Sequence, residues 1–562
     1  MFKGKIVEAV GKLVSEVEVV LDTPEVQMHG DYSANLAMVL AKKEGKKNPK
    51  EIAGKLVESL KKDPELAKIV SKIEVGDPGF INFFISKTAL FEELNKAIRD
   101  ENYGSSGMGE GKTILVEYSA PNIAKPFGIG HLRSTIIGQA LYNLFKYLGY
   151  NTISENHLGD WGTQFGMVIA QIKRKNLEAD KLSVEDLERL YVEFNKEMEA
   201  KPELKEEAKG WFKKLEAKDE EARRIWEAVK ETSLKQFEAV YKRLGVSFEN
   251  MHGESFYEDK MPKVLEEVRQ KGLSKKSEGA EIIEFKGMPP AMLVKSDSTT
   301  TYFTRDLATA KYRVETWKPD ILIYEVGSDQ ILHLRQVFEA VRLMGWAEGR
   351  QFVHVAHGLI RFSEGKMSTR RGQTVKLEEV LDEAVGRSRQ IIEKSQTGRG
   401  LSHEDQIKVS QAVGIGAIKY FDLMHHPTTD IIFDWDKVFV LEGNSGPYLQ
   451  YTVARTNSVL SKAKGISQSQ ENQGSSPNPE ELSVLRSLLH FSDVLESACK
   501  SYSPNLLANY LFELAQRYNN FYNSHRIIGG ENEGFRTSLT QATGRVLKKG
   551  LGILGIETPE KM

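Results

Sequence analysis

The 562-residue sequence contains a single cysteine, Cys499. One thiol cannot form a disulfide within the chain, and it cannot supply a four-cysteine zinc site. These absences exclude the disulfide-stabilised secreted scaffolds and the cysteine-rich zinc modules, and they fit a reducing compartment. We predict no metal site held by protein side chains.

Long hydrophobic runs are also missing. No apolar stretch approaches the roughly 20 residues that a membrane-spanning helix needs. The N-terminus interleaves Lys3, Lys5, Glu8, Lys12 and Glu16 with apolar residues, which is the wrong pattern for a signal peptide. We therefore predict a soluble cytoplasmic protein without a membrane partner.

Net charge is small as well, because 77 Lys and Arg face 79 Asp and Glu. With an isoelectric point near 6.7, bulk charge gives no sign of a nucleic-acid-binding protein, so any RNA contact must come from local patches. The chain does have length and apolar content. Its 562 residues, 40% of them apolar, can build about three to four domains.

The most informative stretch is residues 116–149, VEYSAPNIAKPFGIGHLRSTIIGQALYNLFKYLG. Residues 112–118 are rich in β-formers, two prolines then interrupt regular structure, and apolar residues recur at helical spacing over 132–148. Another short strand is expected at 151–155. The unit predicts a strand, a glycine-containing loop and an amphipathic helix whose N-terminal N–H groups favour a phosphate. This is the geometry of a nucleotide site.

Gly128, Gly130 and His131 occupy the turn before this helix. The glycines permit close approach of a ligand, and a cationic or donating imidazole can meet phosphate oxygens. GIGH alone is better explained as an ordinary strand-to-helix turn. Its flanks are more specific: KPFGIGHLRST resembles the HIGH signature of class I aminoacyl-tRNA synthetases, and SAPNIAKPF is similar to the arginyl-tRNA synthetases. Gly128 replaces the first histidine of the signature.

Two later segments resemble the same family in the same order. NHLGDWGTQFG, residues 156–166, has the glycine content of a shaped loop and is similar to a segment characteristic of arginyl-tRNA synthetases. RFSEGKMSTRRGQTV resembles the KMSKS loop, although an exposed basic turn would explain it too. Thr369 replaces the second lysine of KMSKS. In many arginyl enzymes a lysine upstream of HIGH substitutes for it, and Lys125 holds that position here.

Polar residues gather where predicted parallel strands end. Glu117 closes one strand and Asn122 follows it, while Gln330 comes after the apolar run ILIYEV. Tyr302 and Asp306 are four residues apart and share a helical face if the helix begins at residue 302. Because the C-terminal ends of parallel strands line the ligand crevice of an open α/β sheet, we expect the five side chains to converge. Each one singly is better explained by a structural polar contact, but chance does not explain their shared topological position.

The resemblance covers nearly the whole chain and implies a multidomain fold. We expect an N-terminal α+β domain at residues 1–108 and a Rossmann-type α/β catalytic domain with a parallel sheet at 109–388. The catalytic domain would carry a helical insertion at about 175–290. An all-α anticodon-binding bundle would follow at 389–562.

The implied reaction joins L-arginine and ATP into arginyl-adenylate and then transfers arginine to the 3′-terminal ribose of tRNA(Arg). The resemblance also implies Mg²⁺ with ATP, a monomer, and adenylate formation that depends on the tRNA. The substrate carboxylate attacks the α-phosphorus, so the protein supplies positioning and charge stabilisation and no covalent nucleophile.

By the same match, three side chains would stabilise the transition state and the departing pyrophosphate. These catalytic residues are His131, Lys125 and Lys366. The residues assigned to ATP are Gly128, Gly130, His131, Lys366, Met367 and Ser368.

A guanidinium presents five donors in a rigid fork, so carboxylates are its natural partners. Glu117 and Asp306, with Tyr302, are assigned to the guanidinium of arginine. Asn122 and Gln330 are assigned to its α-amino end.

The match also implies tRNA contacts at both ends of the chain. A phenylalanine and an asparagine of the N-terminal domain would stack on and hydrogen-bond a D-loop base. Near the C-terminus, two tyrosines and an arginine at i, i+3 and i+7 share a helical face suited to splayed anticodon bases, although a packing seam has the same pattern. The chain-terminal methionine would join this face. In order, the residues are Phe80, Asn82, Tyr448, Tyr451, Arg455 and Met562.

Two other functions stay open at this point. Gly128 in place of a signature histidine is compatible with a non-catalytic RNA-binding paralogue. Another class I enzyme, such as a glutamyl-type synthetase, would share the nucleotide fold. The carboxylates of the predicted pocket argue against an acidic amino acid, and pyrophosphate exchange with each amino acid would separate the three functions.

Overall fold

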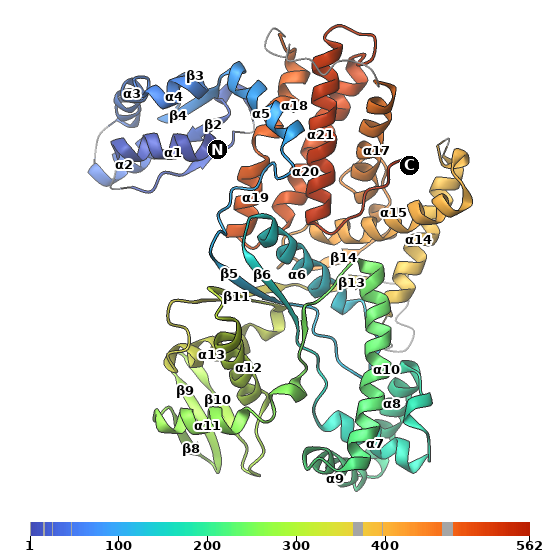
Figure 1. Cartoon of the computed structure of the whole chain (residues 1–562). Helices are drawn as coiled ribbons and strands as arrows, with labels where there is room; N and C mark the ends of the chain where they lie inside the picture. The colour runs from blue at the N-terminus through green and yellow to red at the C-terminus, as the bar shows by residue number, and fades with distance from the viewer. Residues whose placement is uncertain are drawn as a thin grey trace.

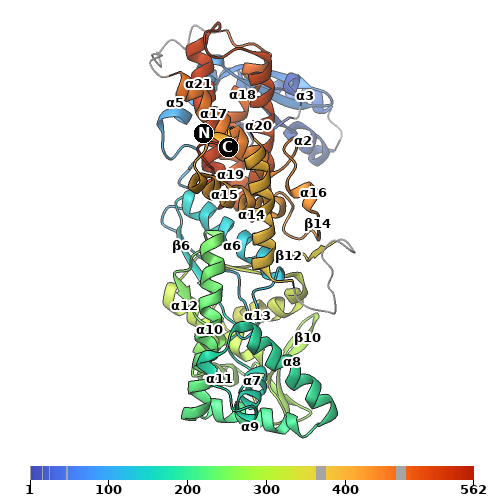
Figure 2. The same ribbon diagram turned by 90° about the vertical axis from the view of Figure 1, so that its right-hand side faces the viewer.

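The computed structural model describes residues 2–14, 17–24, 26–45, 48–362, 375–395, 397–463 and 476–562. Figures 1 and 2 show an elongated molecule, with the N-terminal unit and a helical bundle at one end, a parallel sheet in the middle and two lobes at the other end. The predicted multidomain architecture is thereby confirmed. No helix in these ranges is long and apolar enough to cross a membrane.

The N-terminal unit packs helices on a four-stranded antiparallel sheet of order β1-β2-β4-β3. Local sequence starts its helices: the Asn48 side chain accepts the N–H of Lys50, and Pro49 fits the first turn of the helix that follows. The strands are β1 (Leu21–Asp22), β2 (Tyr32–Ala34), β3 (Val70–Gly76) and β4 (Phe80–Ile85). The helices are α1 (Phe2–Leu13), α2 (Leu36–Glu44), α3 (Pro49–Leu60), α4 (Pro64–Ile69) and α5 (Lys87–Arg99).

The central sheet has five parallel strands in the order β12-β11-β5-β6-β7. They are β5 (Thr113–Glu117), β6 (Asn151–Asn156), β7 (Asn250–Met251), β11 (Ile321–Gly327) and β12 (Gln351–His357). The helix after β5, α6 (Gly130–Tyr147), packs across β5, β6 and β11. It was expected to be amphipathic, but it is buried on nearly every side because bundle helices cover the face turned away from the sheet.

The chain leaves the sheet after β6 to build one helical lobe. Its helices are α7 (Thr163–Arg174), α8 (Val184–Ala200), α9 (Leu204–Glu216) and α10 (Glu220–Leu244). The long helix α10 returns toward the sheet, where Phe237 packs edge-on against Phe127 at 5.5 Å. Residues 156–166 were expected to be one loop, but α7 already begins at Thr163.

The second lobe corrects the expectation of a helical insertion to about residue 290. After α11 (Met261–Gln270) the chain forms an antiparallel sheet of β8 (Ser274–Ser277), β9 (Ala280–Phe285) and β10 (Met288–Val294). Glu278 and Gly279 both have positive φ, which makes the tight two-residue turn that joins twisted strands. Helices α12 (Tyr302–Trp317) and α13 (Ile331–Leu343) then lead back into the central sheet.

The C-terminal bundle consists of α14 (Leu377–Lys394), α15 (His403–Leu423), α16 (Trp435–Val438), α17 (Gly446–Lys462), α18 (Pro479–Leu489), α19 (Phe491–Lys500), α20 (Asn505–Ser524) and α21 (Glu533–Ile553). One short strand interrupts it, since β14 (Ile431–Phe433) pairs in parallel with β13 (Ile360–Phe362), the strand that follows β12 in the chain. The predicted boundary between residues 388 and 389 falls inside α14. A helix is one continuous hydrogen-bonded unit, so we propose a boundary in front of α14 instead.

The N-terminal unit docks onto this bundle. Arg486 of α18 lies 2.9 Å from a carboxylate oxygen of Asp31, and the hydroxyl of Tyr32 donates to Asp493 at 2.6 Å. Helix α5 packs against α18 and α21. The first and last units of the chain therefore form one end of the molecule.

Candidate active site

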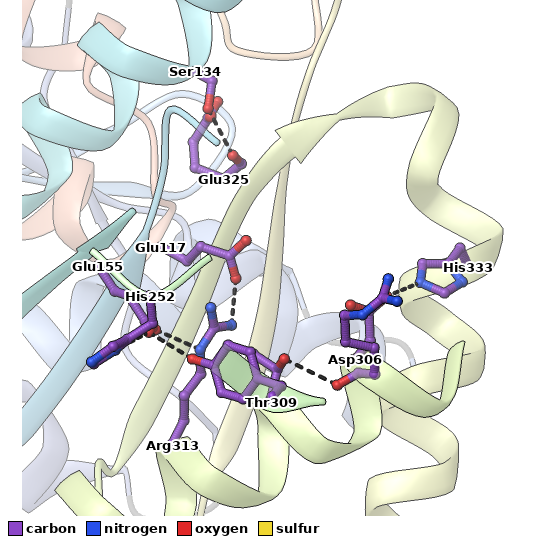
Figure 3. Close-up of polar contacts among 11 residues, drawn as sticks. Glu117, Ser134, Glu155, His252, Asp306, Thr309, Arg313, Glu325 and His333 are labelled. Atoms are coloured by element: carbon purple, nitrogen blue, oxygen red, sulfur yellow. Dashed lines mark hydrogen bonds and ion pairs between the residues drawn. The ribbon is translucent and has the colours of Figure 1, made fainter. Parts of the chain in front are cut away.

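Three side chains form a row across the carboxyl ends of neighbouring strands. In the strand register Tyr324 of β11 stands beside Glu117 of β5, and Glu117 stands beside Glu155 of β6. Arg313 of α12 reaches this row from the side, as Figure 3 shows. Its Nη1 donates to Glu117 Oε2, and its Nε donates to Glu155 Oε2 at 2.6 Å. The Arg313 side chain is completely buried, so a guanidinium is held between two carboxylates inside the fold.

The two carboxylates differ in how many of their oxygens are hydrogen-bonded within the protein. Glu155 Oε1 also lies 3.1 Å from His252 Nδ1 and accepts the hydroxyl of Tyr257 at 2.9 Å. Burial alone would raise the pKa of Glu155, but Arg313 and these hydrogen bonds lower it to about 2. In the described part of the chain Glu117 is engaged only through Oε2. Its second oxygen remains available to a ligand.

A third carboxylate, Asp306, lies on α12, the helix that carries Arg313. Because α12 begins at Tyr302, Tyr302 and Asp306 do share a helical face. Asp306 Oδ2 lies 2.5 Å from Nε2 of His333, and the rings of Tyr302 and His333 are 4.8 Å apart. Tyr302 is 64% exposed, so this cluster opens to solvent. Gln330 lies at the end of the 3₁₀ turn before α13, with its Nε2 3.3 Å from Asp329.

Sequence reasoning missed Arg313 and Glu155. A signal existed for each. Arg313 follows Asp306 by seven residues, two helical turns along the same face, and Glu155 is the last residue but one of β6, beside Glu117 of β5. Buried guanidinium Nη2 of Arg313 and the hydroxyl of Tyr324 have no hydrogen-bond partner among the described residues. Such atoms can bind polar groups of a ligand.

The loop between β5 and α6 has an uncommon backbone. Ser119, Ala120 and Ala124 adopt positive φ values of 76°, 45° and 63°. Conformations of this kind cost of order 1–3 kcal/mol each, so surrounding contacts must hold them. Side chains do so: the N–H groups of Ser119, Ala120 and Ala124 donate to Ser134 Oγ, Asn156 Oδ1 and Ser233 Oγ at 2.9, 3.1 and 3.0 Å.

Asn122 lies exposed in this loop, opposite Gly159. A Cβ atom on Gly159 would come within 2.3 Å of Asn122 Oδ1. The neighbouring Asp160 is buried and bound by Lys230 at 2.6 Å and by Ser255. The glycine-rich segment after β6 therefore supports the position of Asn122.

His131 stands in the first turn of α6, with its ring 5.3 Å from Phe127. Its Nδ1 is buried and has no partner within the described ranges. Burial, together with nearby His357 and Lys125, lowers the pKa of His131. The imidazole is therefore neutral at pH 7 before a ligand binds, so it meets a phosphate as a hydrogen-bond donor.

The segments flanking the predicted ATP residues come together at this turn. Ile129 donates its N–H to the carbonyl of Val375, and Leu377 donates to Phe127, both at 2.9 Å. Buried Gly128 pairs with Lys376, and Gly130 is exposed. Lys125 is exposed, with its ammonium 5.5 Å from the ring of Tyr191. Lys366, Met367 and Ser368 lie outside the described residues.

In the N-terminal unit, Phe80 and Asn82 line one cavity of about 360 Å³. Asn82 is 3% exposed, and its Oδ1 accepts the hydroxyl of Ser33 at 2.7 Å. This volume is of the size that a small planar group fills.

The face expected on α17 is partly exposed. The Arg455 guanidinium lies over the rings of Tyr451 and Tyr522, at 4.9 and 4.7 Å. Tyr451 is 42% exposed, whereas Tyr448 is half-buried and its hydroxyl accepts Asn519 Nδ2 at 2.9 Å.

Met562, which was expected to join that face, is buried against α17. Its side chain is 8% exposed and packs in an apolar cluster that includes Ala454 of α17 and Val413 of α15. The thioether prefers this apolar environment to water, so Met562 supports the helix from beneath.

Comparison with known proteins agrees with these features throughout the chain. A family profile described as the class I tRNA synthetase (R) catalytic domain matches residues 93–435. The arginyl-tRNA synthetase N-terminal domain matches 1–85, and the DALR anticodon-binding domain matches 449–562.

Individual relatives are similar over their full length. The arginine–tRNA ligase of Halothermothrix orenii is 38% identical over 577 residues and 100% of both chains. That of Clostridium kluyveri is 40% identical, with 97% of this chain and 96% of the relative covered. The crystal structure of arginyl-tRNA synthetase from Plasmodium falciparum has a TM-score of 0.87 at 26% identity, covering 100% of this chain and 99% of the other.

The Thermus thermophilus arginyl-tRNA synthetase shares the fold, with a TM-score of 0.85 at 24% identity and 100% of both chains covered. A catalytic profile over more than half of the chain, and relatives 38% and 40% identical from end to end, agree on one assignment. The chain belongs to the arginyl-tRNA synthetases.

Proposed function

We propose that this arginine–tRNA ligase binds the guanidinium of its substrate between Glu117 and Asp306. The observation that carries the proposal is the difference in hydrogen bonding among the carboxylates. Both oxygens of Glu155 are hydrogen-bonded within the protein, whereas Oε1 of Glu117 is available to a ligand. Asp306 lies in the solvent-open cluster with Tyr302. A planar fork of N–H donors fits two such acceptors. The exposed ring of Tyr302 would cover the fork.

Asn122 and Gln330 are proposed for the α-amino end of arginine. Asn122 is exposed and supported by Gly159, and Gln330 ends the turn after β11. Both are amides, whose carbonyl oxygen accepts hydrogen bonds from an ammonium group. An arginine bound along this line would place its carboxylate toward the start of α6.

ATP is proposed to bind with its phosphates at the N-terminus of α6, near Gly128 and Gly130. His131 would donate to the phosphate oxygens from its neutral imidazole, and Lys125 and Lys366 would supply positive charge. Met367 and Ser368 complete the assignment. Attack by the arginine carboxylate on the α-phosphorus then needs only alignment and charge stabilisation.

Mg²⁺ is proposed to arrive bound to the phosphates of ATP. Within the ranges that the structure describes, no three His, Cys, Asp or Glu side chains group as metal ligands. Mg²⁺ commonly keeps several waters and binds through substrate phosphates, which fits this set of residues. The ion would neutralise charge on the departing pyrophosphate.

For tRNA, we propose that Phe80 and Asn82 receive a D-loop base in their shared cavity. Tyr451 and Arg455, with the more buried Tyr448, would meet anticodon bases by stacking. Met562 would act from beneath α17. We further propose that the protein works as a cytoplasmic monomer.

Asp306→Asn tests the guanidinium site, because it keeps the size of the side chain and removes its charge. A charge-assisted pair contributes roughly 1.5 to 3 kcal/mol, so the arginine KM should rise about 10- to 150-fold with little change in the ATP KM. Steady-state arginylation gives both values. Glu315→Gln, at the far end of α12, is the matched control. An unchanged arginine KM would remove Asp306 from the pocket.

Adenylate formation is expected to require cognate tRNA. ATP–pyrophosphate exchange would be measured with arginine, with and without tRNA(Arg), and with each other amino acid in place of arginine. Exchange should appear only with arginine and tRNA together. Equal rates with and without tRNA would contradict the dependence, and exchange with another amino acid would contradict the substrate.

A further inference from the structure

The segment after α21, residues 554–562, runs along α17. Gln450 of α17 donates its Nε2 to the carbonyl of Glu557 at 2.7 Å. Met562 packs against Ala454, the neighbour of Arg455. Figure 1 shows the C-terminus beside α17. This C-terminal tail is thus attached to the helix that carries the proposed anticodon face.

One line of contacts leads from the tail to the catalytic loop through Lys419 of α15. The Lys419 ammonium donates to the carbonyl of Gly555 at 2.6 Å and to the carbonyl of Leu244, the last residue of α10. Lys419 is 3% exposed, and burial lowers its pKa to about 8. One turn before the end of α10, the hydroxyl of Tyr241 lies 2.8 Å from Ser119 Oγ.

A second line leads through α6 from Ile553, the last residue of α21, directly before the tail. Asn143 donates its Nδ2 to the carbonyl of Ile553 at 3.1 Å, and its Oδ1 accepts Gln139 Nε2 at 2.9 Å. Gln139 Oε1 accepts the hydroxyl of Tyr118 at 3.0 Å. Tyr118 is completely buried and directly follows Glu117.

The two lines use different helices and end on adjacent residues, Tyr118 and Ser119. This is where the backbone enters the left-handed conformations that need outside support. The first line continues to the signature turn, since Ser119 Oγ lies 2.8 Å from Thr135 Oγ1, which donates to the carbonyl of His131 at 2.7 Å. A shift of the tail would therefore reach both the arginine side and the ATP side of the loop.

We propose that Lys419 and Asn143 are positioning residues through which the C-terminal tail sets the geometry of the loop between β5 and α6. Through them, occupation of the anticodon face on α17 changes the rate at which arginyl-adenylate forms. The inference rests on the proposed anticodon face. It adds a physical connection between a site on the C-terminal bundle and the site at the central sheet.

The test compares wild type with Lys419→Met, which keeps a long side chain without its ammonium, and with Tyr118→Phe, which removes a single oxygen. Tyr510→Phe is the matched control, because its buried hydroxyl donates to Ser487 within the bundle. Single-turnover adenylate formation is measured at saturating substrates with tRNA(Arg) and with the same tRNA carrying an altered anticodon. The ratio of the two rates reports the connection, and a loss of stability alone does not move it.

Wild type should favour the cognate anticodon by about 5- to 150-fold, the range of typical coupling between sites. In Lys419→Met and Tyr118→Phe the ratio should fall toward one, with tRNA binding unchanged. Tyr510→Phe should keep the wild-type ratio. A wild-type ratio of one would overturn the proposed anticodon face and the inference with it. A wild-type ratio that both variants retain would overturn the inference alone.

Discussion

His131→Ala is expected to lower the rate of tRNA-dependent arginylation by about 10²- to 10³-fold, the loss associated with one contact to a developing oxyanion. The side chain stands in the first turn of α6, where its Nδ1 has no partner in the described ranges and is free to donate to a phosphate. The melting temperature of the variant should stay near that of wild type, because the substitution breaks no hydrogen bond of Nδ1. His403→Ala, at an exposed position in α15, is the control and should leave the rate unchanged.

Gly128→His completes this experiment by restoring the usual signature. We expect wild type to arginylate tRNA and Gly128→His to change the rate far less than His131→Ala does. Gly128 is buried and its backbone pairs with Lys376. An inactive wild type that gains arginylation in Gly128→His would mean that the substitution at residue 128 had abolished catalysis.

Arg313→Met is expected to have the largest effect on stability. Removing one partner from a buried ion pair typically costs 3 to about 5 kcal/mol, because the remaining charge stays buried without compensation. Here two carboxylates, Glu117 and Glu155, would be left. Thermal melting at pH 7 measures the loss. Arg342→Met, which breaks an exposed pair with Glu339, should leave the melting temperature almost unchanged.

Melting temperatures measured at lower pH test this prediction a second time. Arg313 and hydrogen bonds depress the pKa of Glu155 from 4.5 to about 2, so in wild type its contribution to stability is present above pH 4.5 and is lost as the pH falls toward 2. Without Arg313, burial raises the pKa of Glu155, so protonation of this carboxylate removes the uncompensated charge from the variant. The difference in melting temperature between variant and wild type should therefore shrink from pH 7 to pH 4. A difference that grew would contradict the ion-pair explanation.

The sequence was informative where local chemistry fixes the structure. Residues 112–118 are rich in β-formers and contain β5, and Gly128 and Gly130 lie in the turn where α6 begins. Tyr302 and Asp306 could be placed on one face because helical spacing is local. The placement of Glu117 at the end of β5 and of Gln330 after β11 followed from the rule for parallel strands.

Long-range contacts explain what was missed. Arg313 meets Glu117 across 196 residues of chain, and no local pattern identifies the partner of a buried guanidinium. We expected α6 to be amphipathic because its sequence does not reveal the bundle helices that cover the face turned away from the sheet. Strands β8 to β10 follow a long run of charged helices, and the prediction extended this helical region to about residue 290. It therefore missed the turn at Glu278 and Gly279 that joins β8 to β9.

Because α6 is buried by the sheet on one side and by bundle helices on the other, the units of this enzyme are not autonomous. A single apolar cluster includes Phe83 of the N-terminal sheet, Leu141 of α6 and Leu547 of α21. Excising the bundle would expose the apolar surface of α6 to water, at about 25 cal/mol for each Å². A catalytic fragment of this chain would thus be prone to aggregation, and shortening the protein requires a redesigned outer face for α6.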